Sequence, residues 1–153
     1  MPRSTIARID LDALRRNFQT AQRRAGGARV MAVVKADGYG HGIGPVASAL
    51  DSLAPKYAVA CLEEARAIRE TGLIQPVVLL QGVHAEADID ECARSGFEPV
   101  FHSFQQLAWL ERLDTWPAFW LKVNSGMNRL GFHPDELAGV MSRLQAMSAD
   151  TEL

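Results

Sequence analysis

Residues 30–42 read Val30-Met31-Ala32-Val33-Val34-Lys35-Ala36-Asp37-Gly38-Tyr39-Gly40-His41-Gly42, and this stretch decides the fold class. It opens with a short apolar run rich in β-branched side chains, which predicts a buried strand over residues 29–35. Such strands are typical of parallel sheets that are covered on both faces. A glycine-rich turn follows and presents Tyr39 four residues after Lys35.

Lys35 stands at the C-terminal end of this expected strand. Lysine is almost never fully buried without a partner, and in β/α barrels the C-terminal ends of the strands carry the chemistry. A desolvated lysine loses its proton more readily, and the neutral amine can attack a carbonyl. The chemical interpretation is a Schiff-base lysine that holds an aldehyde cofactor. The alternative is a lysine whose long stem reaches solvent.

The rest of the chain alternates between strand and helix patterns. After a short strand at residues 4–9 and a helix capped by Asp10, five strand–helix units follow at intervals of about twenty residues. Strands are expected at residues 29–35, 57–60, 76–80, 98–101 and 117–123, and the helices between them at residues 45–53, 62–71, 85–95, 103–113 and 133–147. This alternation implies parallel pairing with right-handed crossovers. The residues alone leave a doubly wound sheet and a barrel both open.

Residues 120–132 repeat the pattern and read Trp120-Leu121-Lys122-Val123-Asn124-Ser125-Gly126-Met127-Asn128-Arg129-Leu130-Gly131-Phe132. An apolar strand delivers Lys122 near its C-terminal end, and a turn of small residues presents Arg129 seven positions later. Arginine has a rigid fork of donors that suits carboxylates and phenolate oxygens. The alternative is a helix N-terminus capped by Ser125, with Arg129 in solvent.

Composition excludes several classes of function. The chain is 48% hydrophobic and 22% charged, as is typical of a globular domain. Its formal net charge of −2 gives no general attraction to nucleic acid or to an anionic membrane. No apolar run is long enough to cross a bilayer, and no signal peptide is recognised. Cys61 and Cys92 have no metal-ligand or redox spacing, so we expect a cytoplasmic protein without a metal.

Both quoted stretches resemble signatures of the alanine racemases, pyridoxal-phosphate-dependent isomerases of fold type III. Residues 32–42 are similar to the cofactor-attachment signature, and residues 120–132 to a second signature in which a lysine, a glycine-methionine pair and an arginine recur. Residues 7–17 also resemble the start of the family. The resemblance implies that residues 1–153 form the N-terminal part of a (β/α)8 TIM-type barrel. The family's C-terminal β domain is expected to be absent, and residues 1–9 form a possible strand that pairs with it.

The resemblance also implies roles for individual residues. Family members interconvert L- and D-alanine, for peptidoglycan D-alanine or alanine catabolism, with pyridoxal 5′-phosphate held as a Schiff base on the residue that matches Lys35. Lys35 then also serves as the base on one face of the substrate. Arg129 is expected beside the phenolic oxygen of the cofactor and the substrate carboxylate, and Tyr39 beside the phosphate. Lys122 matches a lysine that is often carbamylated and then orients the arginine.

Racemisation needs a second base on the opposite face. In the family this is a tyrosine from the C-terminal domain of a partner subunit, a role that Tyr39 does not match. Family members are more than twice as long as this chain, so we expect residues 1–153 to be inactive alone and the full-length form to be a homodimer. Two alternatives are a non-catalytic pyridoxal-phosphate-binding barrel protein and an inert truncated remnant.

Overall fold

The computed structural model describes residues 5–113 and 115–149 of the 153-residue chain. The strands are β1 (Ala32–Val33), β2 (Tyr57–Val59), β3 (Val77–Leu79), β4 (Phe97–Phe101) and β5 (Trp120–Leu121). The helices are α1 (Leu11–Arg24), α2 (Lys35–Gly40), α3 (Ile43–Ala49), α4 (Leu62–Glu70), α5 (Ala87–Ser95), α6 (Phe104–Leu110) and α7 (Leu137–Ala149), with a 3₁₀ turn η1 (Pro134–Glu136) before α7.

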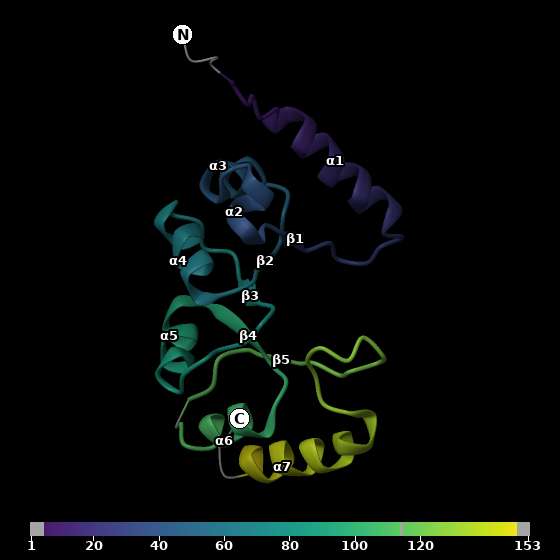
Figure 1. The fold of residues 1–153 in the computed structure, drawn as a ribbon, viewed down its shortest axis with the longest axis vertical. Coiled ribbons are helices and arrows are strands. Elements are labelled where there is room, and N and C mark those ends of the chain that lie inside the picture. The colour runs from purple at the N-terminus through teal and green to yellow at the C-terminus, as the bar shows by residue number, and fades with distance from the viewer. Residues whose placement is uncertain (1–4, 114, 150–153) are drawn as a thin grey trace.

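All five strands form one parallel sheet in the order β1-β2-β3-β4-β5. Helices α3, α4, α5 and α6 lie along one side of this sheet, and the other side is the open inner face (Figure 1). A doubly wound sheet would reverse its strand order and carry helices on both faces, whereas a barrel adds each strand beside the last one and keeps its helices outside. The fold is therefore α/β, part of a TIM-type barrel, which confirms the predicted fold class.

The main core lies between the sheet and the outer helices. Tyr57, Val77 and Phe97 are register partners across β2, β3 and β4, and their side chains are buried in this core. The Tyr57 hydroxyl donates a hydrogen bond to the Ala47 carbonyl of α3 (2.8 Å), so this buried polar group is satisfied. Alternate residues point to the inner face, where a smaller cluster contains Ala58, Val78 and Val100.

The first strand is shorter and more open than predicted. Only Ala32 and Val33 pair with β2, instead of all of residues 29–35. Ala32 and Val34 are buried, but Val33, between them, is 41% exposed. Because the inner face carries no helix over β1 in the described residues, the expectation of a strand covered on both faces is wrong here.

The N-terminal strand predicted over residues 1–9 is not formed at residues 5–9, which are irregular, and residues 1–4 lie outside the described part. The domain expected to pair with this strand lies outside this chain, so that pairing stays a prediction. The helix that follows begins as predicted, because Asp10 Oδ1 accepts a hydrogen bond from the Ala13 N–H (2.9 Å). The helix predicted over residues 45–53 is α3, which begins at Ile43 and ends at Ala49, earlier at both ends than predicted.

Two further features bear on the predicted class of protein. Within the described residues, no helix is long and apolar enough to span a membrane. Cys61 and Cys92 are free thiols; Cys92 is buried on α5, and burial raises the pKa of its thiol to about 12. Cys92 is therefore an apolar core residue and not a reactive one.

Candidate active site

The sheet places both signature lysines at one edge. Because the strands are parallel, the residues that follow β1, β3 and β5 all lie at the C-terminal edge of the sheet. Lys35 comes two residues after β1, and Lys122 comes directly after β5. The Lys122 Nζ atom donates a hydrogen bond to the carbonyl of Leu80, which follows β3 (2.8 Å). Lys122 therefore reaches across the end of β4, along the edge where β/α barrels carry their chemistry.

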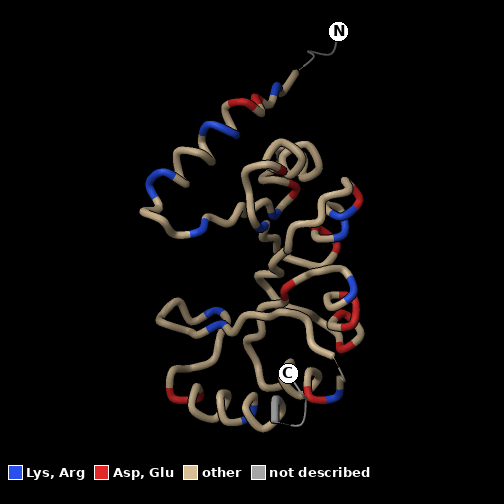
Figure 2. Tube along the Cα trace, turned by 180° about the vertical axis from the view of Figure 1, so that it is seen from behind, with Lys and Arg blue, Asp and Glu red and all other residues tan. Residues whose placement is uncertain are grey.

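The charges of Lys35 and Arg129 both act on Lys122. Partial burial lowers the pKa of Lys122, and the positive charges of Arg129 and then Lys35 lower it further. None of the ion pairs in the described residues joins Lys35, Lys122 or Arg129 to a carboxylate. Acidic and basic segments are intermixed along the outer helices, whereas the loop after β5 carries basic segments alone (Figure 2). The structure thus places Lys35 and Arg129 near enough to Lys122 for their charges to lower its pKa, and none of the three pairs with a carboxylate of the described residues.

Lys35 is the first residue of α2, most of which is a left-handed turn. The next four residues, Ala36, Asp37, Gly38 and Tyr39, have φ values of 53°, 53°, 62° and 55°, with ψ between 37° and 52°. This is one turn of left-handed helix, which costs about 1–2 kcal/mol for each residue that is not glycine. The sequence predicted only a glycine-rich turn, because alanine, aspartate and tyrosine each favour right-handed or extended backbone. Strain of this kind is typical of functional sites.

Several hydrogen bonds hold the left-handed turn in place. Asp37 Oδ1 accepts from the Ile43 N–H (2.8 Å), and the Asp37 carbonyl accepts from the Gly42 N–H (2.9 Å). The Glu64 carboxylate on α4 accepts from the Ala36 N–H (2.6 Å). The turn is therefore held both from within and from the neighbouring helix.

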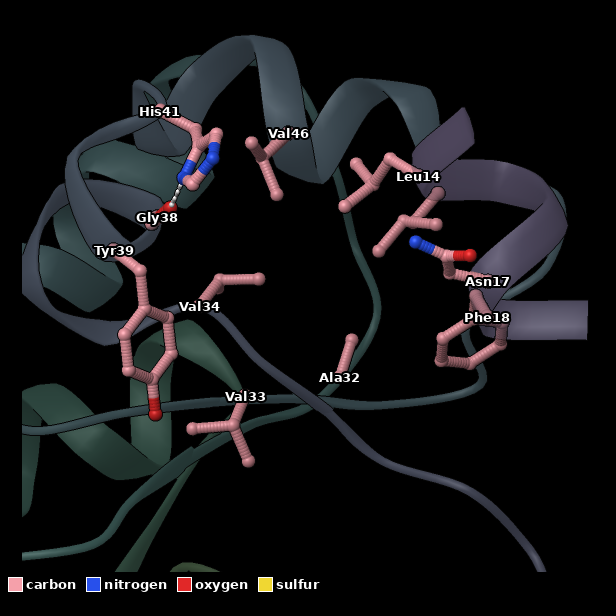
Figure 3. A pocket seen from close by; sticks show the side chains of 11 residues that line it. Leu14, Asn17, Phe18, Ala32, Val33, Val34, Gly38, Tyr39, His41 and Val46 are labelled. Carbon is pink, nitrogen blue, oxygen red and sulfur yellow. Dashed lines mark hydrogen bonds between the residues drawn. The ribbon is translucent and has the colours of Figure 1, made fainter. Parts of the chain in front are cut away.

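Tyr39 projects from the turn and is 59% exposed. In Figure 3 its ring extends past Val34 to the level of Val33, with the hydroxyl at the far end from Gly38. It lines one side of a cavity of about 250 Å³ between α1, β1 and α3, which is otherwise mostly apolar. That cavity offers little to a charged ligand, whereas the exposed Tyr39 hydroxyl is free to contact a ligand at the sheet edge.

The loop after β5 carries Arg129. Val123 and Phe132 form a bridge, and Asn124 Oδ1 accepts from the N–H groups of Gly126 (3.2 Å) and Asn128 (2.9 Å). Residues 125–131 contain no helix, so the alternative in which Ser125 caps one is wrong. Arg129 is exposed on this closed loop.

The close packing of this loop requires glycine at one position. At Gly131, with φ of 121°, a Cβ atom would lie 2.7 Å from the Asn124 nitrogen. A cleft of about 310 Å³ opens beside the loop, with Lys122 and Arg129 both in its lining. The backbone of the loop, and not a helix, therefore sets where the Arg129 fork can reach.

Lys56, the remaining lysine of the three in this sequence, is paired with a carboxylate. Its Nζ atom lies 2.6 Å and 2.5 Å from the two carboxylate oxygens of buried Glu98, and Trp120 Nε1 donates to the same carboxylate (2.7 Å). Lys56 precedes β2, so this network lies toward the N-terminal end of the strands. A lysine whose charge is paired with a carboxylate in this way stays protonated and is a poor nucleophile. Lys56 therefore differs from the lysines at the other edge of the sheet.

Sequence reasoning missed two contributors to the site. Glu64 stands in the first turn of a helix rich in good helix formers, so it looked like an ordinary solvated residue. Leu80 contributes through its backbone carbonyl, which leaves no trace in the side-chain pattern. Among the described residues, no group of three or more His, Cys, Asp or Glu side chains is arranged to hold a metal ion.

Comparisons with known proteins agree with this geometry. The profile of the family described as "Alanine racemase, N-terminal domain" matches residues 9–153. An alanine racemase from Marinobacter nauticus is 61% identical over 95% of this chain and 40% of its own length. The solved alanine racemase of Acinetobacter baumannii is 37% identical, with a TM-score of 0.85 over 91% of this chain and 40% of that structure.

The biosynthetic alanine racemase of Pseudomonas aeruginosa is 36% identical, with a TM-score of 0.84 over 90% of this chain and 39% of that structure. The chain thus spans about 40% of the length of these relatives. A family match over nearly all of the chain is accompanied by the same fold and by the two signature stretches at one sheet edge. The chain belongs to the family of alanine racemase N-terminal domains.

Proposed function

We propose that this chain forms part of an alanine racemase, which interconverts L- and D-alanine with pyridoxal 5′-phosphate as its cofactor. The observation that carries the proposal is the placement of Lys35, Lys122 and Arg129 at the C-terminal edge of the sheet, where the charges of Lys35 and Arg129 act on Lys122 and where Lys122 and Arg129 line one cleft. Three cations without a carboxylate partner are unfavourable together unless an anion joins them. The site therefore suits a ligand with more than one negative charge.

The chemistry of these side chains fits that cofactor. Pyridoxal phosphate presents an aldehyde, a phenolic oxygen and a phosphate. An amine (Lys35), a guanidinium (Arg129) and a phenol (Tyr39) are matching partners for these three groups. When bound, the cofactor supplies an electron sink for the charge left by removal of the α-proton.

We assign each residue a role on this basis. Lys35 would hold the cofactor through its Nζ atom and, once the substrate has displaced it, would move the α-proton on one face of the substrate. The Arg129 fork binds the substrate carboxylate and the phenolic oxygen. The Tyr39 hydroxyl would donate a hydrogen bond to the cofactor phosphate. The strained turn fixes the directions in which Lys35 and Tyr39 project.

The opposing base has to come from outside residues 1–153. This stretch contains two tyrosines. Tyr57 is fully buried on the outer side of the sheet, donates to the Ala47 carbonyl, and has a pKa raised to about 12, chiefly by burial. Tyr39 belongs to the same turn as Lys35. Neither tyrosine suits the opposite face, and the resemblance to the family leads us to propose a homodimer in which a tyrosine of the partner subunit serves it.

We further propose a cytoplasmic enzyme that supplies D-alanine or takes part in alanine catabolism. The free thiols of Cys61 and Cys92 suit a reducing compartment. A small substrate, alanine, suits a site built from one amine and one guanidinium that can bind a carboxylate. The proposed function needs neither nucleic acid nor a membrane as a partner.

A racemisation assay tests the proposal directly. The full-length protein with saturating pyridoxal phosphate is expected to convert L-alanine into D-alanine, as followed by circular dichroism. Residues 1–153 alone are expected to give no rate above free cofactor, because loss of one positioned base typically costs 10²–10⁴-fold.

Other outcomes would identify the competing functions. A full-length protein that binds the cofactor without racemisation would be a non-catalytic carrier. One that shows neither property would be an inert remnant. A rate from residues 1–153 that Lys35→Ala abolishes would place a complete site within this stretch.

Lys122 is proposed to carry a carbamate, formed when its neutral amine adds CO₂ and releases one proton. The depressed pKa of Lys122 raises the fraction of neutral amine, and the product replaces a positive charge beside Arg129 and Lys35 with a negative one. In ¹³C-bicarbonate the full-length protein is expected to show a carbamate carbon signal that strengthens as the pH rises. The signal should be lost in Lys122→Gln and kept in Lys56→Arg; equal signals in both would contradict the assignment.

A further inference from the structure

One carboxylate links the left-handed turn to the neighbouring strand. Glu64 Oε1 accepts a hydrogen bond from the Ala36 N–H (2.6 Å), and Glu64 Oε2 accepts one from the Ala60 N–H (2.7 Å). Ala36 directly follows Lys35, and Ala60 directly follows the last residue of β2. One oxygen of Glu64 thus holds the start of the left-handed turn, and the other holds the residue that follows β2, both at the edge of the sheet where Lys35 lies. Both distances are typical of charge-assisted hydrogen bonds.

The turn requires such an external restraint. Three of its four left-handed residues are not glycine, so the turn stores several kcal/mol of strain. Strained backbone persists only where the surroundings over-determine it. The internal bonds of Asp37 fix the later part of the turn, toward Ile43 and Gly42. Glu64 holds its first residue, which is the one joined to Lys35.

The two bonds also require a carboxylate of this length. A glutamine amide could accept one N–H through its oxygen, but its NH₂ group would then face the other N–H, donor against donor. An aspartate would keep the charge, but its side chain is one methylene shorter and could not reach both N–H groups. The arrangement therefore depends on bridging by both oxygens and not on negative charge alone.

We propose that Glu64 is a positioning residue that sets the direction of Lys35 by tying the left-handed turn to the end of β2. It acts through the backbone and touches neither cofactor nor substrate. The part of this inference that concerns cofactor attachment rests on the proposed function, whereas the restraint on the turn does not. The two parts can be tested separately on the full-length protein.

The first measurement is amide hydrogen exchange in a peptide that covers residues 33–42. Glu64→Gln is expected to speed exchange at the Ala36 amide by about tenfold or more, because its charge-assisted bond is either lost or replaced by a weaker bond to a neutral amide oxygen. Glu64→Asp should do the same. The matched control is Glu70→Gln, which makes the same chemical change at the other end of α4. It should leave exchange in residues 33–42 unchanged.

Three exchange results would overturn the restraint, two of them at the turn itself. One is an unchanged rate in Glu64→Gln. The other is full retention of the wild-type rate in Glu64→Asp, which would show that charge and not bridging matters. A rise spread equally over β4 and α5 would also overturn it, because it would reveal a general loss of stability; the urea midpoint checks this point.

The second measurement follows Lys35 itself. With pyridoxal phosphate and borohydride, the rate of labelling at Lys35 is expected to fall about tenfold in Glu64→Gln and in Glu64→Asp, while Glu70→Gln labels like wild type. Wild-type labelling of Lys35 that persists at full rate in both Glu64 variants would overturn the positioning role and leave the proposed function standing. Absence of Lys35 labelling in the wild type would instead overturn the proposed function, and the exchange experiment would still decide the restraint.

Discussion

Lys35→Ala is expected to lower racemisation by the full-length protein by about 10⁴-fold or more, because Lys35 is proposed to hold the cofactor and to move the proton on one face. Lys35 stands at the edge of the sheet where β/α barrels carry their chemistry, at the start of the left-handed turn. Its positive charge acts on Lys122, and it has no carboxylate partner among the ion pairs of the described residues. The measurement is kcat/KM for L-alanine at saturating cofactor.

Peptide mapping shows which lysine reacts. Residues 1–153 contain three lysines, so borohydride reduction has few candidates to label. We expect the pyridoxyl group on Lys35. The matched control is Lys56→Arg, which keeps the charge that pairs with Glu98 and should leave both labelling and turnover near wild type. A pyridoxyl group on Lys56 or Lys122, with Lys35 unmodified, would contradict the assignment.

Arg129→Lys is expected to lower kcat by about 10–100-fold while the cofactor stays bound. The substitution keeps the positive charge but loses the planar fork, so bidentate contact with a carboxylate is no longer available. The loop that carries Arg129 is closed by Asn124 and by the Val123–Phe132 bridge, so it should hold its shape in the variant. The measurements are kcat and KM for L-alanine, with the absorbance of bound cofactor recorded on the same sample.

An arginine outside the site, Arg112, provides the matched control. Arg112, after α6, forms an exposed ion pair with Glu86 (3.2 Å) and lies outside the site. Arg112→Lys should leave the kinetics unchanged, since exposed ion pairs contribute little. If Arg129→Lys also left kcat and KM unchanged, Arg129 would be only a solvated loop residue and its proposed role would fall.

Much of the site could be predicted because local patterns carry it. The β-branched run before Lys35 and the apolar run before Lys122 indicated strands, and both lysines lie at strand ends in the structure. Asp10 was recognised as a helix cap from its residue type, and it caps α1. These features depend on neighbours within a few residues, so the chain sequence specifies them directly.

The boundaries of β1 could not be predicted in the same way. An apolar run indicates that burial is favourable, but it does not show which face of the strand is covered by another element. Ala32 and Val34 meet the outer helices, whereas Val33 faces the open inner side. Strand length is decided by pairing with β2, a contact between residues more than twenty positions apart in the chain.

Sequence by itself thus determined an alternating α/β chain, the two signature turns and the residue types that can bind an anionic aldehyde cofactor. Only the tertiary structure decided that the strands follow one another in barrel order, that residues 36–39 turn left-handed, and that Arg129 sits on a loop. It also decided that Lys122 reaches Leu80 and that Glu64 holds Ala36. The physical reason is that each of these outcomes depends on a contact between distant segments. Left-handed backbone in particular is locally unfavourable, and it persists here because a carboxylate from another helix and the bonds of Asp37 offset its cost.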